Sequence, residues 1–226
     1  MTSLLAIETS AEACSVALDV GGEIREKFEH APMRHAEILL PAIHALLAEA
    51  DMPLSRLDAI AFGRGPGSFT SLRIGIGVVQ GLAWGADLPV VPVSSLAAVA
   101  QQAIDFAGGK RPVCVAMDAR MQEVFSCHFR ADGNGLARAI DEERVCSPAA
   151  VQITAGEAFI AAGNGFERYP ELAAAAGRAD QCFSGIWPRA ATVIHLAKDW
   201  LSGHEALPAM QAQPVYVRNK VADKPS

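Results

Sequence analysis

The chain has 226 residues, of which 51% are hydrophobic and 19% charged, and its formal net charge is −6 at pH 7. This length fits one large domain or two compact lobes, and it is sufficient for a substantial core. Nucleic-acid binding depends mainly on neutralising phosphates. The negative charge therefore argues against a protein that holds RNA by itself, and any RNA contact would need another subunit.

No apolar stretch reaches the roughly 18 to 20 residues that a membrane-spanning helix needs. The segment from Met1 to Thr9 lacks a basic region followed by an apolar run, so it does not resemble a signal peptide. We therefore expect a soluble, cytoplasmic protein. The cysteines are odd in number and contain no CxxC pair, which fits neither a disulfide framework nor a zinc ribbon. We expect small core residues at Cys14, Cys114, Cys127, Cys146 and Cys182.

The first third of the chain predicts a meander of three strands and then a helix. Strand-length runs lie at 4–7, 14–18 and 23–28, separated by turn residues. From His35 to Ala50 apolar residues recur at helical spacing, and Pro53 follows the end of the pattern. This segment predicts an amphipathic helix.

A glycine-rich loop joins a short strand at 59–62 to a helix that is apolar nearly all round, from Leu72 to Ala83. The loop runs from Gly63 to Thr70. A strand at 90–93 and a helix from Ser95 to about Phe106 follow, and we place a lobe boundary at the next glycine pair.

The second half of the chain repeats this plan. It predicts strands at 113–117 and 123–129, an extended run ending near Val145, a helix starting at Ser147-Pro148, a strand at 158–162, a turn at 163–165 and a helix at 192–202. The repeat predicts an α/β fold of two related lobes, residues 1–107 and 108–205, with a tail at about 206–226 that returns to the first lobe.

The glycine-rich loop has the residues of an anion site. Alternating glycines before a helix allow close backbone approach, and free N–H groups at a helix N-terminus attract anions. The spacing matches neither a dinucleotide fingerprint nor a P-loop. The predicted nucleotide or phosphate contacts are Glu8, Thr9, Ser10, Gly65, Gly67 and Ser68, with a turn or capping role as the alternative for Glu8.

The helix after the loop contains Gly75, Gly77, Gly81 and Gly85. Each glycine costs roughly 1 kcal/mol relative to alanine inside a helix, so some contact should compensate. Tight packing on the chain's own sheet is one explanation. We favour the other, in which a helix from another chain approaches this face.

Catalytic and metal sites find little support in the sequence. His35 and His44 are nine residues apart, so they are not stacked on one helix face, and no HExxH motif is present. Ser68 does not lie in a GxSxG motif. Asp118-Ala119-Arg120 fits a charged hairpin turn. We predict neither catalytic residues nor a metal site.

Five segments together resemble the TsaB (YeaZ) family. They are Leu5-Ala6-Ile7-Glu8-Thr9-Ser10, His35-Ala36-Glu37-Ile38-Leu39-Leu40-Pro41, Gly65 to Gly75, Val91-Pro92-Val93-Ser94-Ser95-Leu96 and Pro214-Val215-Tyr216-Val217-Arg218. The resemblance is specific from residue 3 to about 107 and looser beyond. It implies the actin/hexokinase/Hsp70-like (ASKHA) fold, with a mixed sheet flanked by helices in each lobe.

The resemblance also implies a function. Proteins of this family associate with a catalytic paralogue, TsaD, and an ATPase, TsaE, in a complex that attaches threonylcarbamoyl to N6 of adenosine 37 in tRNAs reading ANN codons. It implies contact with tRNA only through the complex, a homodimer when the chain is alone, and no firm cofactor, with ATP or ADP at the subunit interface as an open prediction.

Two departures from the related sequences bear on the chemistry. The paralogue carries a pair of metal-binding histidines in an HxxxH motif. This chain has Ser95 and Val99 at those positions, and these residues cannot coordinate a metal ion. The family's first strand usually ends in Asp-Thr-Ser, and Glu8 replaces that aspartate here. The resemblance therefore implies a non-catalytic scaffold.

The family's pairing surface uses the two helices predicted at about 35–50 and 70–85. On that basis the interface residues are His35, Ile38, Leu39, Ala42, Ile43, Leu46, Leu72, Ile74, Gly75, Val78, Val79, Gly81 and Leu82. A small-molecule phosphotransferase of the same superfold is the alternative function, and a peptidase acting on the partner is a weaker one.

Overall fold

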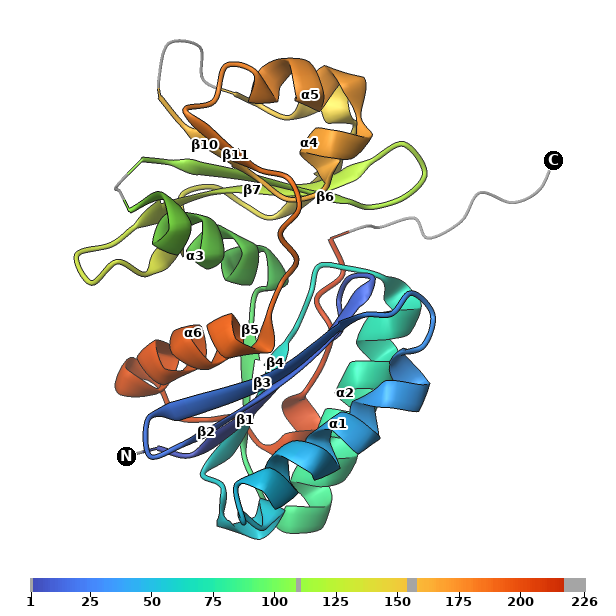
Figure 1. Cartoon of the computed structure of the whole chain (residues 1–226), viewed down its shortest axis with the longest axis vertical. Helices are drawn as coiled ribbons and strands as arrows, with labels where there is room; N and C mark the ends of the chain where they lie inside the picture. Colours follow the sequence, from blue (N-terminus) through green and yellow to red (C-terminus); the bar gives the residue numbers. More distant parts are fainter. Residues whose placement is uncertain (1, 109–110, 154–157, 218–226) are drawn as a thin grey trace, which may run out of the picture.

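The first sheet of the computed structural model is built from the N-terminal part of the chain (Figure 1). The structure describes residues 2–108, 111–153 and 158–217. The five strands, in the order β3-β2-β1-β4-β5, are β1 Leu4–Glu8, β2 Ala13–Val20, β3 Glu23–His30, β4 Ala59–Gly63 and β5 Val90–Val93. The first three form an antiparallel meander, and β4 and β5 run parallel to β1. The predicted meander is confirmed.

The second sheet repeats the same strand order. Its strands, in the order β11-β10-β6-β7-β8, are β6 Val113–Asp118, β7 Val124–Ala131, β8 Ala137–Ala139, β10 Ile160–Ala162 and β11 Gln181–Phe183, while β9 Arg144–Cys146 also pairs with β7. Strand pairs β6–β7 and β7–β8 are antiparallel, and β10 is parallel to both β6 and β11. Two mixed sheets with one topology confirm the predicted ASKHA fold of two related lobes.

Helices separate and cover the two sheets (Figure 1). The helices are α1 His35–Glu49, α2 Phe69–Ala86, α3 Ser95–Ala107, α4 Gly165–Arg168, α5 Pro170–Ala176 and α6 Ala190–Gly203. α1 and α2 cover one face of the first sheet, and α4 and α5 cover the outer face of the second. α3 and α6 lie between the sheets and contact each other.

The packing of α3 and α6 differs from the predicted lobe boundary. α3 follows the last strand of the first sheet, yet its apolar residues belong to the core around β6, β7 and β10. α6 comes from the second half of the chain and packs on β1, β2, β4 and β5. The second sheet is therefore covered by α3, which precedes the predicted boundary at residue 107, and the first sheet is covered by α6, which follows it. Each sheet needs a helix on this face because the face is apolar.

The described part of the tail runs back along the first lobe. Val90 and Leu207 exchange backbone hydrogen bonds, Gln80 Nε2 donates to the carbonyl of Ala212, and Val215 N donates to the carbonyl of Arg64. Residues 218–226 of the predicted tail lie outside the described residues. Across the described ranges, no helix combines the length and apolar character needed to cross a membrane.

Most predicted elements are present, but the region after β9 differs. The helix expected to start at Ser147-Pro148 is only a 3-10 turn at Pro148–Ala150. The turn predicted at 163–165 leads directly into α4, and neither α5 nor β11 is among the predicted elements. The hairpin turn predicted at Asp118-Ala119-Arg120 is confirmed, because it joins antiparallel β6 to β7.

Candidate functional site

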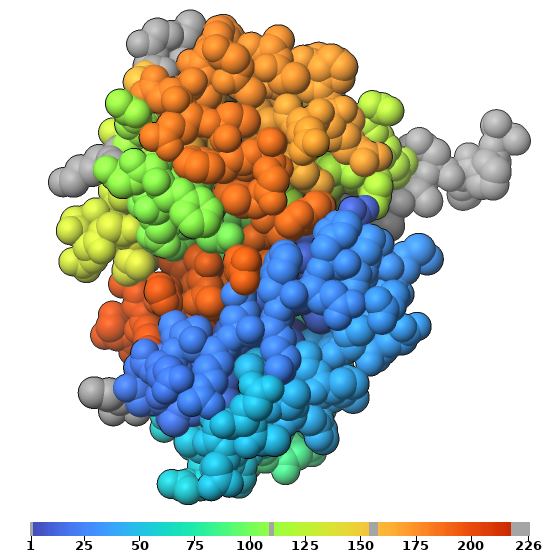
Figure 2. All heavy atoms as spheres, viewed as in Figure 1, coloured from blue at the N-terminus to red at the C-terminus, as the bar shows by residue number. Residues whose placement is uncertain are grey.

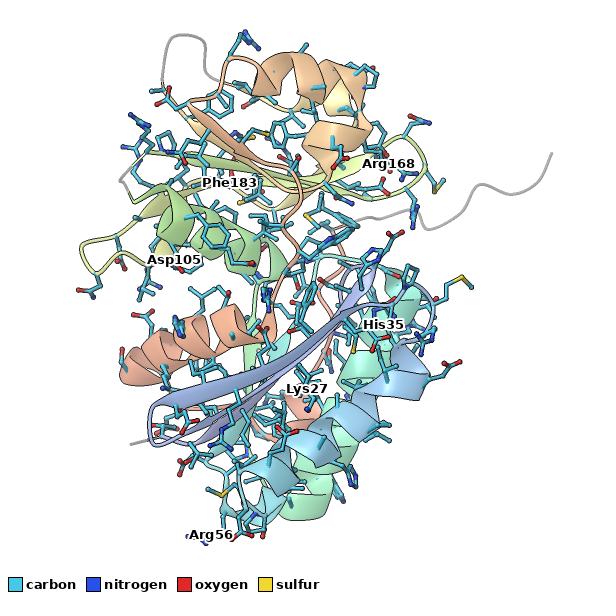
Figure 3. The ribbon with its side chains drawn as sticks, viewed as in Figure 1. Lys27, His35, Arg56, Asp105, Arg168 and Phe183 are labelled. Atoms are coloured by element: carbon cyan, nitrogen blue, oxygen red, sulfur yellow. The ribbon has the colours of Figure 1, made fainter. Side chains whose placement is uncertain are left out.

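A cavity of about 510 Å³ lies between the two lobes. The first lobe lines it with the turn after β1, the glycine-rich loop and the first turn of α2, and the second lobe lines it with the β6–β7 turn and Asn164. Figure 2 shows blue N-terminal residues and orange residues from the second half of the chain in contact at the waist of the molecule. In Figure 3, His35 of α1 and Arg168 of α4 lie on the same side of the molecule, one on each lobe.

Glu8 lies beneath this cavity and not on its wall. Its side chain is fully buried. Oε1 accepts a hydrogen bond of 2.6 Å from Ser10 N, and Oε2 accepts one of 2.7 Å from Ser95 Oγ. A Cβ atom on Gly63 would clash with this carboxylate, so the loop must have glycine there. Burial raises the pKa of Glu8 above its ordinary value. The carboxylate thus supports the turn after β1 from inside.

The six predicted nucleotide contacts divide into two groups. Ser10, Gly67 and Ser68 line the cavity, whereas Glu8, Thr9 and Gly65 do not. Thr9 Oγ1 donates instead to the carbonyl of Ser71, at 3.0 Å. Whether a phosphate contacts the first group stays a prediction.

The glycine-rich loop packs directly against the turn that follows β1. Ser68 N donates to the carbonyl of Ser10 at 2.7 Å, and a Cβ atom on Gly67 would clash with the Ser10 backbone. Gly65 has a φ of +94°, which favours glycine. These close contacts account for the loop's glycines and direct the first turn of α2 towards the cavity.

Aromatic and apolar side chains form much of the cavity wall. Phe69 and Tyr216 lie 5.5 Å apart between ring centroids, and the Arg73 guanidinium lies over Phe69 and donates to Tyr216 Oη. Trp187 also lines the cavity, and its ring centroid lies 5.3 Å from that of His30. The tail therefore closes one side of the cavity by stacking on the start of α2.

Ser95 and Val99 do not fit a divalent metal ion. Ser95 is buried and donates to Glu8, and Val99 is fully buried in the core of the second lobe. Neither side chain offers the nitrogen, thiolate or carboxylate ligands that zinc or iron prefers. Among the described residues, no three His, Cys, Asp or Glu side chains are grouped to hold a metal.

The predicted interface residues mostly face the chain's own core. The buried members are His35, Leu39, Ile43, Leu46, Leu72, Gly75 and Val79, the half-buried ones are Ile38, Ala42, Ile74, Val78 and Leu82, and the exposed one is Gly81. Helical periodicity selects the apolar stripe that packs on the sheet. The buried seven are therefore unavailable to a partner in the folded chain.

The glycines of α2 serve two different purposes. A Cβ atom on Gly75 would clash with Thr9 Oγ1, so this glycine allows α2 to pack closely on the end of β1. A Cβ atom added at Gly77, Gly81 or Gly85 would meet no atom within 4 Å, so these three glycines face open space. Their spacing of four residues places them on one face of the helix.

α1 and α2 lie side by side and contact each other, and together they leave a set of mainly small and apolar residues exposed. We call it the α1–α2 face, and it comprises Leu40, Pro41, His44, Ala48, Gly77, Gly81, Trp84 and Gly85, all exposed. Trp84 is 69% exposed and Leu40 is 42% exposed. Neither residue is predicted from the sequence as part of such a face, because both lie within apolar runs. The glycines of α2 could not have indicated this face, because Gly75 packs inward while Gly77, Gly81 and Gly85 face open space.

The cysteines are free thiols. Cys14, Cys114 and Cys127 are buried as predicted, and burial raises the pKa of Cys114 to about 12. The prediction is wrong for Cys182, which is exposed on β11, and Cys146 is only half-buried. Both lie on strands at an edge of the second sheet, where each strand has one neighbouring strand and less cover.

The comparisons with known proteins agree along nearly the whole chain. The family model described as "TsaD: tRNA N6-adenosine threonylcarbamoyltransferase" matches residues 28–204. The tRNA threonylcarbamoyladenosine biosynthesis protein TsaB of Escherichia coli (strain K12) is 38% identical over 98% of this chain and 96% of its own length. The protein of that name from Haemophilus influenzae is 40% identical, with the same coverage.

A solved structure gives the same result in three dimensions. YeaZ from Pseudomonas aeruginosa is 41% identical, with a TM-score of 0.87, and the match covers 96% of this chain and 100% of that one. Sequence identity and fold therefore agree over both lobes. With relatives this similar over nearly its whole length, the chain belongs to the TsaB (YeaZ) family.

Proposed function

We propose that this chain is a non-catalytic subunit required for N6-threonylcarbamoylation of adenosine 37 in tRNAs that read ANN codons. It acts in the cytoplasm by binding and activating the catalytic paralogue TsaD, together with the ATPase TsaE. The observation that carries the proposal is the full-length similarity to proteins named for tRNA threonylcarbamoyladenosine biosynthesis. Contact with tRNA comes through the complex, in keeping with the net charge of −6.

The α1–α2 face supports a role in pairing. Trp84 is a large aromatic side chain exposed beside three glycines that leave room for a second helix to approach. Buried tryptophans dominate the binding energy of many interfaces, and small residues let two helix backbones come close. We propose that TsaD packs a helix pair on this face, and that a second copy of the chain occupies it when TsaD is absent.

The residues at the cavity support the assignment as a non-catalytic subunit. Ser95 and Val99 replace the histidine pair of the paralogue, and Ser95 is engaged with buried Glu8. Glu8 in turn is too deeply buried to serve a ligand as base or magnesium partner. We propose that ATP or ADP, where it is bound in the complex, lies at the subunit interface and is held mainly by the partner.

The test is pairing and modification with purified components. The chain is mixed with TsaD, and the mass of the complex is measured by size-exclusion chromatography with light scattering. Formation of modified adenosine is then measured with TsaE, ATP, threonylcarbamoyl adenylate and tRNA. We expect a heterocomplex and a modification that depends on this chain. A chain that stays alone while modification proceeds without it would overturn the proposal and call for a screen of ATP-dependent phosphotransfer.

A matched pair of variants tests the surface. Trp84→Ala should weaken binding to TsaD by about 30-fold or more, because truncating an aromatic hot spot costs at least about 2 kcal/mol. Phe106→Ala is the control, since Phe106 is also exposed but lies at the end of α3, away from the α1–α2 face. Equal binding by both variants would show that TsaD uses another surface.

A further inference from the structure

Two carboxylate–guanidinium pairs cross between the lobes beside the cavity. In the first, Glu12 of the β1–β2 turn pairs with Arg120 of the β6–β7 turn. In the second, Arg64 of the glycine-rich loop pairs with Glu143, which lies just before β9, with Nη1 and Oε2 3.0 Å apart. Each lobe therefore supplies one acid and one base, so the two pairs favour a single relative position of the lobes.

The first pair depends on an unusual turn. Arg120, Met121 and Gln122 have φ angles of 60°, 53° and 59°, three successive non-glycine residues in the left-handed region. This conformation is strained for residues with a Cβ atom, and surrounding contacts must compensate. Arg120 N donates to Asp118 Oδ1 at 3.0 Å, and its guanidinium reaches Glu12 across the cavity mouth.

The second pair lies where the chain passes from one lobe to the other. Glu143 also accepts a hydrogen bond from Ser94 Oγ, and that hydroxyl accepts one from Ala97 N at the start of α3. Arg64 is fixed through its backbone, which bonds to Val93 and Val215. The Glu143 side chain is only 12% exposed, so solvent screens this pair less than an exposed one.

We propose that these two pairs act together as an ionic clamp that holds the lobes closed over the cavity, so that loss of both charges opens it. Opening moves the β6–β7 turn away from the first lobe and widens the cavity, whose wall includes the half-buried Trp187 and the already exposed Phe69 and Tyr216. The clamp is a property of the chain by itself and does not depend on the proposed partner.

The test uses charge-neutralising variants that keep side-chain shape. Glu12→Gln, Glu143→Gln and the double variant are compared by amide hydrogen exchange over residues 64–72 and 117–124, and by small-angle X-ray scattering. Glu49→Gln is the control, because Glu49 pairs with Lys27 within the first lobe. We expect the double variant to exchange about tenfold faster in both segments, a factor equivalent to about 1.4 kcal/mol, with a larger radius of gyration.

Salt provides an independent readout, since about 1 M salt reduces the screening length to about 3 Å. The wild-type chain should expand in high salt, whereas the double variant, already open, should not. Unchanged scattering in the double variant would overturn the clamp. Faster exchange without expansion would also overturn it, because that result means local loosening of the two turns.

Discussion

Gly75 and Gly81 lie on the same helix, yet the structure predicts opposite effects for the same substitution. A Cβ atom on Gly75 would enter the space of Thr9 Oγ1, which itself bonds to the carbonyl of Ser71. Gly75→Ala should therefore destabilise the fold by about 1–3 kcal/mol, the range for overpacking. Gly81→Ala meets open space and should stabilise α2 by up to about 1 kcal/mol.

Urea unfolding of the two variants measures this difference directly. The two alanine substitutions share a helix and a chemistry, so each is the control for the other. Equal and small effects would mean that α2 can move away from β1 without cost. The clash at Gly75 would then not be a constraint on the fold.

Glu8 predicts a pH dependence of stability. Burial raises the pKa of Glu8 in the folded state, so the folded chain binds this proton more tightly than the unfolded chain does. The stabilisation from the protonated form is complete below the ordinary value of 4.5 and is lost as pH rises through the folded value. Glu8→Gln removes this titration, since glutamine stays neutral.

The direction of this pH dependence is tested by measuring the unfolding free energies of the wild type and of Glu8→Gln between pH 4 and pH 8. The stability of the wild type relative to the variant should fall as the pH rises. A constant difference across this range would show that Glu8 titrates alike in the folded and unfolded chains. The hydrogen bonds from Ser10 and Ser95 would then fully offset the burial.

At the scale of elements, the contact between β3 and α6 predicts a strong dependence on one carboxylate. Glu26 accepts hydrogen bonds from Ser15 Oγ, from Nε and Nη2 of Arg189, and from Ala191 N in the first turn of α6. The Glu26 side chain is 13% exposed, and removing it leaves the Ser15 and Ala191 donors without their acceptor. Arg189 is 42% exposed and can turn to solvent, so Glu26→Ala should destabilise the fold by about 1–3 kcal/mol.

Glu23→Ala is the matched control on the same strand. Its carboxylate is exposed and, among the described residues, bonds to Arg25 two positions along the strand, so this substitution should leave stability nearly unchanged. Thermal unfolding of both variants separates the two cases. Similar shifts would mean that α6 is held by its apolar face alone.

The sequence predicted the elements whose signal is long and periodic. The predicted bounds of α1 and α6 lie within a few residues of the observed ones. Each helix has about four turns, so its apolar periodicity stays clear even where single residues depart from it. α5 and β11 were not predicted from the sequence, although proline is common at the first position of a helix and Pro170 stands there in α5. Three residues such as Gln181–Phe183 carry no measurable alternation, and only pairing with β10 makes them a strand.

The exposed face of α2 could not be predicted from apolar periodicity. The helix is apolar nearly all round, so its pattern does not tell the residue that packs inward from the one that faces solvent. Val79 is fully buried and Trp84 is largely exposed, although both are apolar. The surrounding sheet decides between them, and only the structure shows where it lies. The same limit made buried residues such as Leu39 appear as partner contacts.

At the scale of the whole molecule, the lobes are joined by more than the two chain crossings. α3 completes the core of the second sheet although it follows the first, and α6 completes the first sheet although it follows the second. The two helices contact each other between the sheets. Neither half of the sequence contains all the residues that its own sheet needs to be covered. The local pattern could not show this exchange, because it depends on contacts between distant segments.

This exchange predicts that the two lobes unfold as one unit. If α6 leaves the first sheet, it uncovers buried residues such as Val193 and Ile194, and α3 loses its neighbour at the same time. Scanning calorimetry should therefore give a single transition, with a calorimetric enthalpy equal to the van't Hoff enthalpy. Two separate transitions, or an enthalpy ratio well above one, would show that each lobe is stable without the helix that the other half of the chain supplies.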